Sequence, residues 1–124
     1  FTKKIIKNKK INLYNSGKNV RDFTYIDDLI NAVSKLALYE KHNLFEIYNV
    51  GSGKTISIEK LINILENMIG KKALIKNEKF FKGDVKSTKS SMDKYETIFG
   101  KIKHTNFKDG LKNFYSWYNE YNNE

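Results

Sequence analysis

One arginine stands out in a chain whose other basic side chains are all lysine. Arg21 is the only arginine among 23 lysine and arginine residues, and Asp22 and the aromatic Phe23 follow it directly. A planar guanidinium group binds a phosphate or a carboxylate through two parallel hydrogen bonds, which a lysine ammonium group cannot form. Arg21 is therefore a candidate ligand for a diphosphate. A structural ion pair with Asp22 or Asp28 is the alternative that these residues leave open.

Asp84 is a second candidate binding residue, because it follows Gly83 in a segment that is typical of an exposed loop. A carboxylate in such a loop accepts hydrogen bonds from two neighbouring hydroxyl groups, such as those of a ribose. An ordinary turn aspartate has the same local sequence, and the spacing does not distinguish the two.

The segment Gly51-Ser52-Gly53-Lys54-Thr55 has some features of a phosphate-binding P-loop, since it lies between a predicted strand and a predicted helix. The full motif needs another glycine at the position that Tyr48 occupies. The predicted helix also begins at Ser57, too late to direct its N-terminus at a phosphate held by the loop. We therefore expect a tight turn here and no nucleotide-hydrolysing site.

Other polar residues are better explained by structure than by chemistry. Asp27 and Asp28 stand where a helix is expected to begin, and carboxylates there stabilise the helix N-terminus rather than bind a metal. His42 and His104 have no neighbours at metal-ligand spacing, so we expect both at the surface. No Ser/His/Asp set can be assembled, and the absence of cysteine excludes disulfides and thiol catalysis.

Alternating strands and helices position these residues. Apolar spacing predicts strands at residues 10–14, 45–50 and 73–75 and a turn at residues 15–19. It also predicts helices at residues 28–37, 57–69, 91–99 and 107–121, the second capped by Ser57 and ended by Gly70. This order indicates an α/β fold with a small parallel sheet. Trp117, Tyr118 and Tyr121 are expected to lie in the core.

The composition excludes several functional classes. The length of 124 residues fits one domain, and 40% hydrophobic residues are enough for a core. The net charge of +9 comes from scattered lysines, so we expect no nucleic-acid partner. No apolar run approaches the roughly 18 residues of a membrane-spanning helix. We expect a soluble cytoplasmic protein with no membrane contact.

Several short stretches together resemble the NAD-dependent epimerase/dehydratase family, the extended short-chain dehydrogenases/reductases that act on nucleotide sugars. The pairing of Tyr14-Asn15 with the string at residues 21–28 is most similar to the UDP-glucuronate 4-epimerase branch. The matching stretches, in the family's order, are Phe1-Thr2-Lys3, Leu13-Tyr14-Asn15, Gly17 with residues 21–28, Tyr48-Asn49-Val50-Gly51, Gly83-Asp84-Val85, Asp109-Gly110-Leu111 and Trp117-Tyr118.

The resemblance implies an enzyme of two parts. Its N-terminal Rossmann domain binds NAD through a glycine-rich turn and carries a Tyr-x-x-x-Lys catalytic pair, and neither feature is present in this sequence. Tyr14 and Lys18 have the pair's spacing, but they stand on a turn instead of a helix. Residues 1–124 would then be the C-terminal nucleotide-sugar-binding region. They would comprise late parallel strands of the Rossmann domain and a small, mostly helical substrate-binding domain, inactive by itself.

By the same resemblance, Arg21 would bind the UDP diphosphate, Tyr14 would flank the uracil ring, and Asp84 would accept the ribose hydroxyls. The implied reaction is the NAD-dependent interconversion of UDP-glucuronate and UDP-galacturonate through a 4-keto intermediate, by an enzyme that is a homodimer and serves polysaccharide biosynthesis. Two departures from the family pattern, Phe81 before Gly83 and residues 89–91 after Thr88, leave alternatives. These are a dehydratase or reductase of the same superfamily, or a binding module without catalysis.

Overall fold

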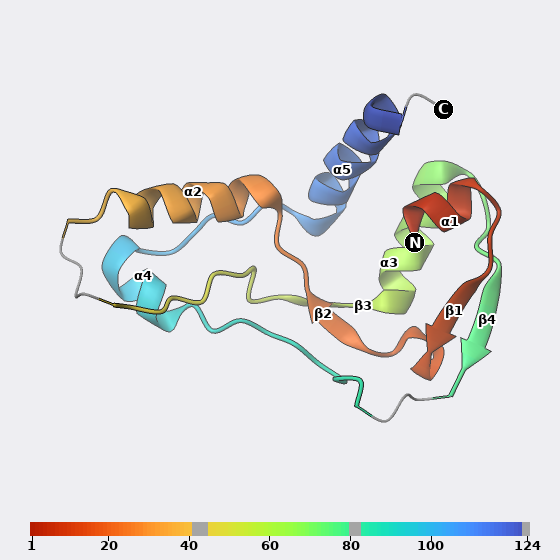
Figure 1. Ribbon diagram of the computed structural model, residues 1–124, viewed down its shortest axis with the longest axis horizontal. Helices are drawn as coiled ribbons and strands as arrows, with labels where there is room; N and C mark the ends of the chain where they lie inside the picture. The colour runs from red at the N-terminus through yellow and green to blue at the C-terminus, as the bar shows by residue number, and fades with distance from the viewer. Residues whose placement is uncertain (41–44, 80–82, 123–124) are drawn as a thin grey trace.

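The chain folds into alternating helices and strands, as its sequence predicts. The computed structural model describes residues 1–40, 45–79 and 83–122 (Figure 1). Its elements, in chain order, are α1 (Thr2–Ile6), β1 (Ile11–Tyr14), the 3-10 turn η1 (Asn15–Gly17), β2 (Val20–Asp22), α2 (Ile26–Ala37), β3 (Thr55–Ser57), α3 (Ile58–Ile69), β4 (Ile75–Glu78), α4 (Asp93–Phe99) and α5 (Phe107–Asn122).

Two small sheets organise the described residues. Strands β1 and β4 are parallel and run in register from Ile11 opposite Ile75 to Tyr14 opposite Glu78. Strands β2 and β3 form an antiparallel pair in which Arg21 lies opposite Ile56. The second sheet differs from the single parallel sheet that the sequence predicts. Strand β2 is only three residues long, which is too short for the alternation of apolar residues by which a strand is predicted from sequence.

The first hydrophobic core joins α1, β1 and α3, which lie together at one end of the molecule (Figure 1). Its buried side chains are Ile5, Ile11, Leu61 and Leu65. Helix α3 begins and ends where its sequence predicts. The Ser57 hydroxyl oxygen accepts a hydrogen bond from the Lys60 N–H at 3.1 Å, and Gly70 ends the helix at a φ of 72°, which favours glycine.

A second core lies at the other end, where α2 and α4 face each other (Figure 1). Ala32, Met92 and Tyr95 are its buried members. Neither Asp27 nor Asp28 caps α2, because the helix begins at Ile26 and both residues lie within its first turn. Ile30 and Val33, two of the apolar residues in this helix, are exposed.

Two sequence predictions, one about a strand and one about burial, are wrong. Residues 45–50 form no strand, and Phe45 and Ile47 are 79% and 65% exposed. A strand needs a hydrogen-bonded neighbour, and the described residues provide none for this segment. Trp117 and Tyr121 on α5 are 53% and 74% exposed rather than in the core. Their rings stack on each other instead, with centroids 5.4 Å apart.

None of the helices within the described ranges is both long and apolar enough to cross a membrane.

Candidate functional site

The two charged residues that the sequence singles out meet in the structure. Arg21, in the middle of β2, places its Nη2 atom 2.9 Å from Oδ1 of Asp84, which lies 63 residues later in the chain. Arg21 Nη1 also donates a hydrogen bond to the Val20 carbonyl oxygen at 2.8 Å. Asp84, rather than Asp22 or Asp28, is therefore the partner of the arginine. The side chains are 27% and 31% exposed, so both groups remain accessible to a ligand.

Asn19 holds the other oxygen of the same carboxylate. Its Nδ2 group donates a hydrogen bond to Asp84 Oδ2, and its Oδ1 accepts one from Asn15 Nδ2 at 2.8 Å. Asn19 is only 3% exposed. A polar chain thus runs from Asn15 through Asn19 and Asp84 to Arg21. Sequence reasoning missed Asn19, because an asparagine in a turn cluster gives no sign that tertiary packing buries it.

Tyr14 is the last residue of β1, immediately before Asn15. The strand alternates buried and exposed side chains, and this alternation puts Ile11 and Leu13 inside and Tyr14 outside. The aromatic ring is therefore presented to solvent at the end of the strand where the polar chain begins. This placement is compatible with stacking on a flat heterocycle.

Asp22 connects three separate segments of the chain. Its Oδ1 accepts hydrogen bonds from the Ser52 N–H at 2.9 Å and the Ser52 hydroxyl at 2.5 Å, while Oδ2 accepts from the N–H groups of Gly53 and Ser90, each at 3.0 Å. Burial by itself would raise the pKa of this carboxyl, but these hydrogen bonds outweigh it, the Ser52 hydroxyl most strongly, so the pKa is lowered. Asp22 is therefore ionised at neutral pH. Its hydrogen bonds attach the end of β2 to the segments that carry Ser52 and Ser90.

Residues 51–53 form the tight turn that the sequence predicts, and two of its N–H groups donate to this carboxylate. The Ser52 and Gly53 N–H groups point at Asp22, and the Gly51 N–H at Met92 Sδ, 3.0 Å away. A Cβ atom on Gly51 would lie 2.4 Å from the Ser90 Cβ, so only glycine fits. Because these N–H groups are already engaged, the turn does not fit the diphosphate of a nucleotide or of NAD.

Asp28 is structural, as predicted, but through Thr105 rather than as a cap of α2. Its buried carboxylate accepts hydrogen bonds from the Thr105 N–H and hydroxyl, both at 2.8 Å, and so attaches the start of α2 to the segment before α5. His104 Nδ1 lies 3.8 Å from Asp28 Oδ2, and its side chain is only 13% exposed. The prediction of a surface His104 is therefore wrong, because tertiary packing covers most of its side chain. His42 lies outside the described residues.

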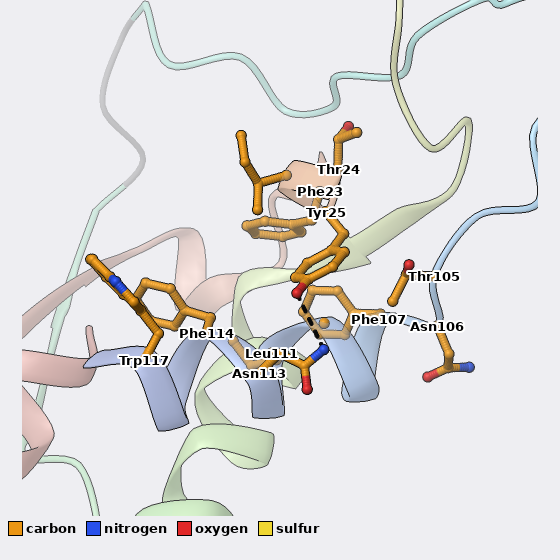
Figure 2. A pocket seen from close by; sticks show the side chains of 12 residues that line it. Phe23, Thr24, Tyr25, Thr105, Asn106, Phe107, Leu111, Asn113, Phe114 and Trp117 are labelled. Atoms are coloured by element: carbon orange, nitrogen blue, oxygen red, sulfur yellow. Dashed lines mark hydrogen bonds between the residues drawn. The ribbon is translucent and has the colours of Figure 1, made fainter. Parts of the chain in front are cut away.

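A separate apolar cavity of about 670 Å³ lies beside α5, and we call it the α5 groove (Figure 2). Figure 2 shows Phe23 and Tyr25 facing Phe107, Phe114 and Trp117 of the helix. The Tyr25 hydroxyl accepts a hydrogen bond from Asn113 Nδ2 at 3.2 Å. Its aromatic walls suit an apolar surface better than a charged sugar nucleotide. The charged residues Arg21 and Asp84 are not among those that line it.

The sequence matches known proteins along most of its length. The model of the NAD dependent epimerase/dehydratase family matches residues 1–51. The UDP-glucuronate 4-epimerase of Thermodesulfobacterium geofontis is 38% identical over 122 residues, which cover 97% of this chain and 36% of that protein.

Solved structures agree with this likeness. The UDP-glucuronic acid 4-epimerase of Bacillus cereus, in complex with UDP-glucuronic acid and NAD, superposes with a TM-score of 0.85 at 28% identity, over 97% of this chain and 38% of that chain. MoeE5 in complex with UDP-glucose and NAD superposes with a TM-score of 0.86 at 20% identity, over 97% and 40%. The chain therefore spans about two fifths of the length of the proteins that it matches. Its α/β fold is consistent with the C-terminal portion of such an enzyme.

Proposed function

Because the chain belongs to the NAD-dependent epimerase/dehydratase family, we propose that it is the nucleotide-sugar-binding region of a UDP-glucuronate 4-epimerase. Such an enzyme interconverts UDP-glucuronate and UDP-galacturonate through a 4-keto intermediate. Support for this substrate comes from the likeness to the UDP-glucuronate 4-epimerases of two bacteria, one of them bound to UDP-glucuronic acid.

The observation that carries the proposal is the meeting of Arg21 and Asp84. Within the described residues, Arg21 uses one N–H of Nη1 and one of Nη2, and a guanidinium group has five N–H donors. The remaining donors bind the oxygens of a diphosphate, whose charge a guanidinium fork matches. Asp84, beside the arginine, is the group that accepts the ribose hydroxyls. Tyr14 flanks the uracil ring from the end of β1.

We place NAD and the catalytic residues outside these 124 residues. The one glycine turn that follows the pattern Gly-x-Gly, at residues 51–53, has its N–H groups directed at Asp22 and Met92. The chain's own contribution is to bind the nucleotide and to orient the sugar toward a catalytic domain. That domain corresponds to the part of the relatives' sequences that this chain does not match. By itself the chain would bind UDP-sugar without turning it over.

Titration calorimetry on the chain tests this proposal. UDP and UDP-glucuronate should bind more tightly than UMP, because UMP lacks the second phosphate. They should also bind more tightly than ADP, because the relatives that support the proposal act on or bind UDP-sugars. Raising the salt concentration should weaken binding only mildly, since one arginine carries the contact, whereas nucleic-acid binding falls steeply with salt. Equal affinity for UMP, ADP and UDP would contradict the proposal. A preference for dTDP-glucose over UDP-glucuronate would favour a dehydratase of the same superfamily.

A further inference from the structure

We propose that Asn19 is a positioning residue of the nucleotide site, which fixes the Asp84 carboxylate so that it in turn orients Arg21. This inference rests on the proposed function, because it assigns Asn19 a part in the binding of the nucleotide by Arg21 and Asp84. Asn19 itself does not touch the ligand in this scheme. It acts through Asp84.

The orientation of the Asn19 amide follows from its two neighbours. The Asp84 carboxylate can only accept, so Asn19 must turn its donor end toward Asp84 and its oxygen, Oδ1, toward Asn15 Nδ2. The Asn19 Nδ2 group is then directed at Asp84 Oδ2. The opposite amide orientation would put two NH₂ groups together at one end and two oxygens together at the other. The side chain therefore has one favourable arrangement, and in it Asn19 donates to Asp84.

The backbone around Asn19 is fixed as firmly as its side chain. The Asn19 carbonyl oxygen accepts a hydrogen bond from the Ile58 N–H at 3.0 Å, at the first residue of α3. The next residue, Val20, donates its N–H to the Lys86 carbonyl oxygen at 2.9 Å and accepts from the Thr88 N–H at 3.3 Å. The segment that carries Asp84 is thus attached to β2 just beyond the carboxylate. Asn19 adds the side-chain contact that fixes the carboxylate itself.

Asp84 has one oxygen on Asn19 and the other on Arg21. A carboxylate held at only one oxygen can rotate about its side-chain torsions, whereas one held at both has a defined plane. The hydrogen bond from Arg21 depends on the plane of the carboxylate, so that plane also sets the orientation of the guanidinium group. Removing the Asn19 amide should therefore loosen Arg21 without touching it. A burial of 97% for Asn19 also means that water does not readily replace the lost donor.

A double-mutant cycle in UDP binding tests this role. Asn19→Ala should weaken UDP binding roughly tenfold in the otherwise unchanged chain, as expected for loss of a hydrogen bond to a charged group. In the Asp84→Ala background the same substitution should change the Kd less than about twofold, because its effect passes through Asp84. Asn63→Ala, at an exposed position of α3, is the matched control: it should leave the Kd unchanged and should not lower the thermal midpoint, since alanine favours a helix more than asparagine does.

Each outcome decides the inference. An equal loss of affinity in both backgrounds would overturn it, since a general structural effect does not depend on Asp84. No loss in either background would overturn it as well. If the unchanged chain does not bind UDP at all, the proposed function fails, and the same cycle read on thermal midpoints tests the Asn19–Asp84 link. Coupled midpoints would then keep Asn19 as the residue that positions Asp84, and additive midpoints would remove that role too.

Discussion

Replacing Asp22 should destabilise the fold much more than its partial exposure suggests. Its carboxylate accepts four hydrogen bonds, three from backbone N–H groups and one from a hydroxyl, and these come from residues 30 to 68 positions away. At about 0.5–1 kcal/mol each, after discounting for solvent access, the four bonds sum to about 2–4 kcal/mol. Asp22→Asn keeps one acceptor oxygen but turns an NH₂ group toward N–H donors. We therefore expect it to lose about 2–3 kcal/mol of the free energy of unfolding.

Urea unfolding at pH 7, followed by circular dichroism, measures this loss, together with a fall of roughly 10 °C in thermal midpoint. Asp27→Asn is the matched control, because Asp27 is exposed in the first turn of α2 and contributes only about 0.3–1 kcal/mol through the helix dipole. A loss for Asp22→Asn no larger than that of the control would refute the reasoning.

The pH dependence gives an independent check with a fixed sign. The pKa of Asp22 in the folded chain is lowered from its unfolded value of about 3.9. Its contribution is therefore complete above the unfolded pKa and disappears as the pH falls through the folded pKa. The stability difference between the unchanged chain and Asp22→Asn should be constant from pH 7 to about pH 5 and should narrow below about pH 4. A difference that stays constant down to pH 2.5 would contradict the assignment.

The other predictions concern the ligand, the turn and the α5 groove. Arg21→Ala should cost on the order of 2 kcal/mol of UDP affinity, about thirtyfold in Kd by calorimetry, and Arg21→Lys should restore only part of it because the planar fork is lost; a Kd within threefold of the original would contradict the diphosphate contact. Gly51→Ala should lower the thermal midpoint, because its Cβ would lie 2.4 Å from the Ser90 Cβ. Gly70→Ala should lower it less, because its Cβ meets no neighbour within 4 Å and only the positive φ is unfavourable for alanine. Equal shifts for the two variants would argue against the clash. The exposed aromatic rings beside the α5 groove should make the chain self-associate, and Trp117→Lys should shift its mass in light scattering toward the monomer; an unchanged chain that is monomeric at high concentration would refute this.

The sequence determined the features that depend on neighbouring residues. Helix α3 begins at the Ser57 cap and ends at Gly70, because both signals act within one helical turn. Alternation in β1 predicts which of its side chains are buried, since successive residues of a strand point to opposite faces. The sequence alone also showed that residues 51–55 do not match a P-loop, because that motif is defined by neighbouring residues.

The tertiary structure alone decided which polar groups meet. The sequence singled out Arg21 and Asp84 separately, but they are 63 residues apart, and no local pattern records that the loop carrying Asp84 returns to β2. The same holds for Asp22, whose partners come from two other segments, and for Asn19, whose burial no turn sequence reveals. Burial of Trp117 was predicted wrongly for a related reason. Hydrophobic spacing shows which face of a helix can be covered, and only the path of the chain decides whether a covering surface is there.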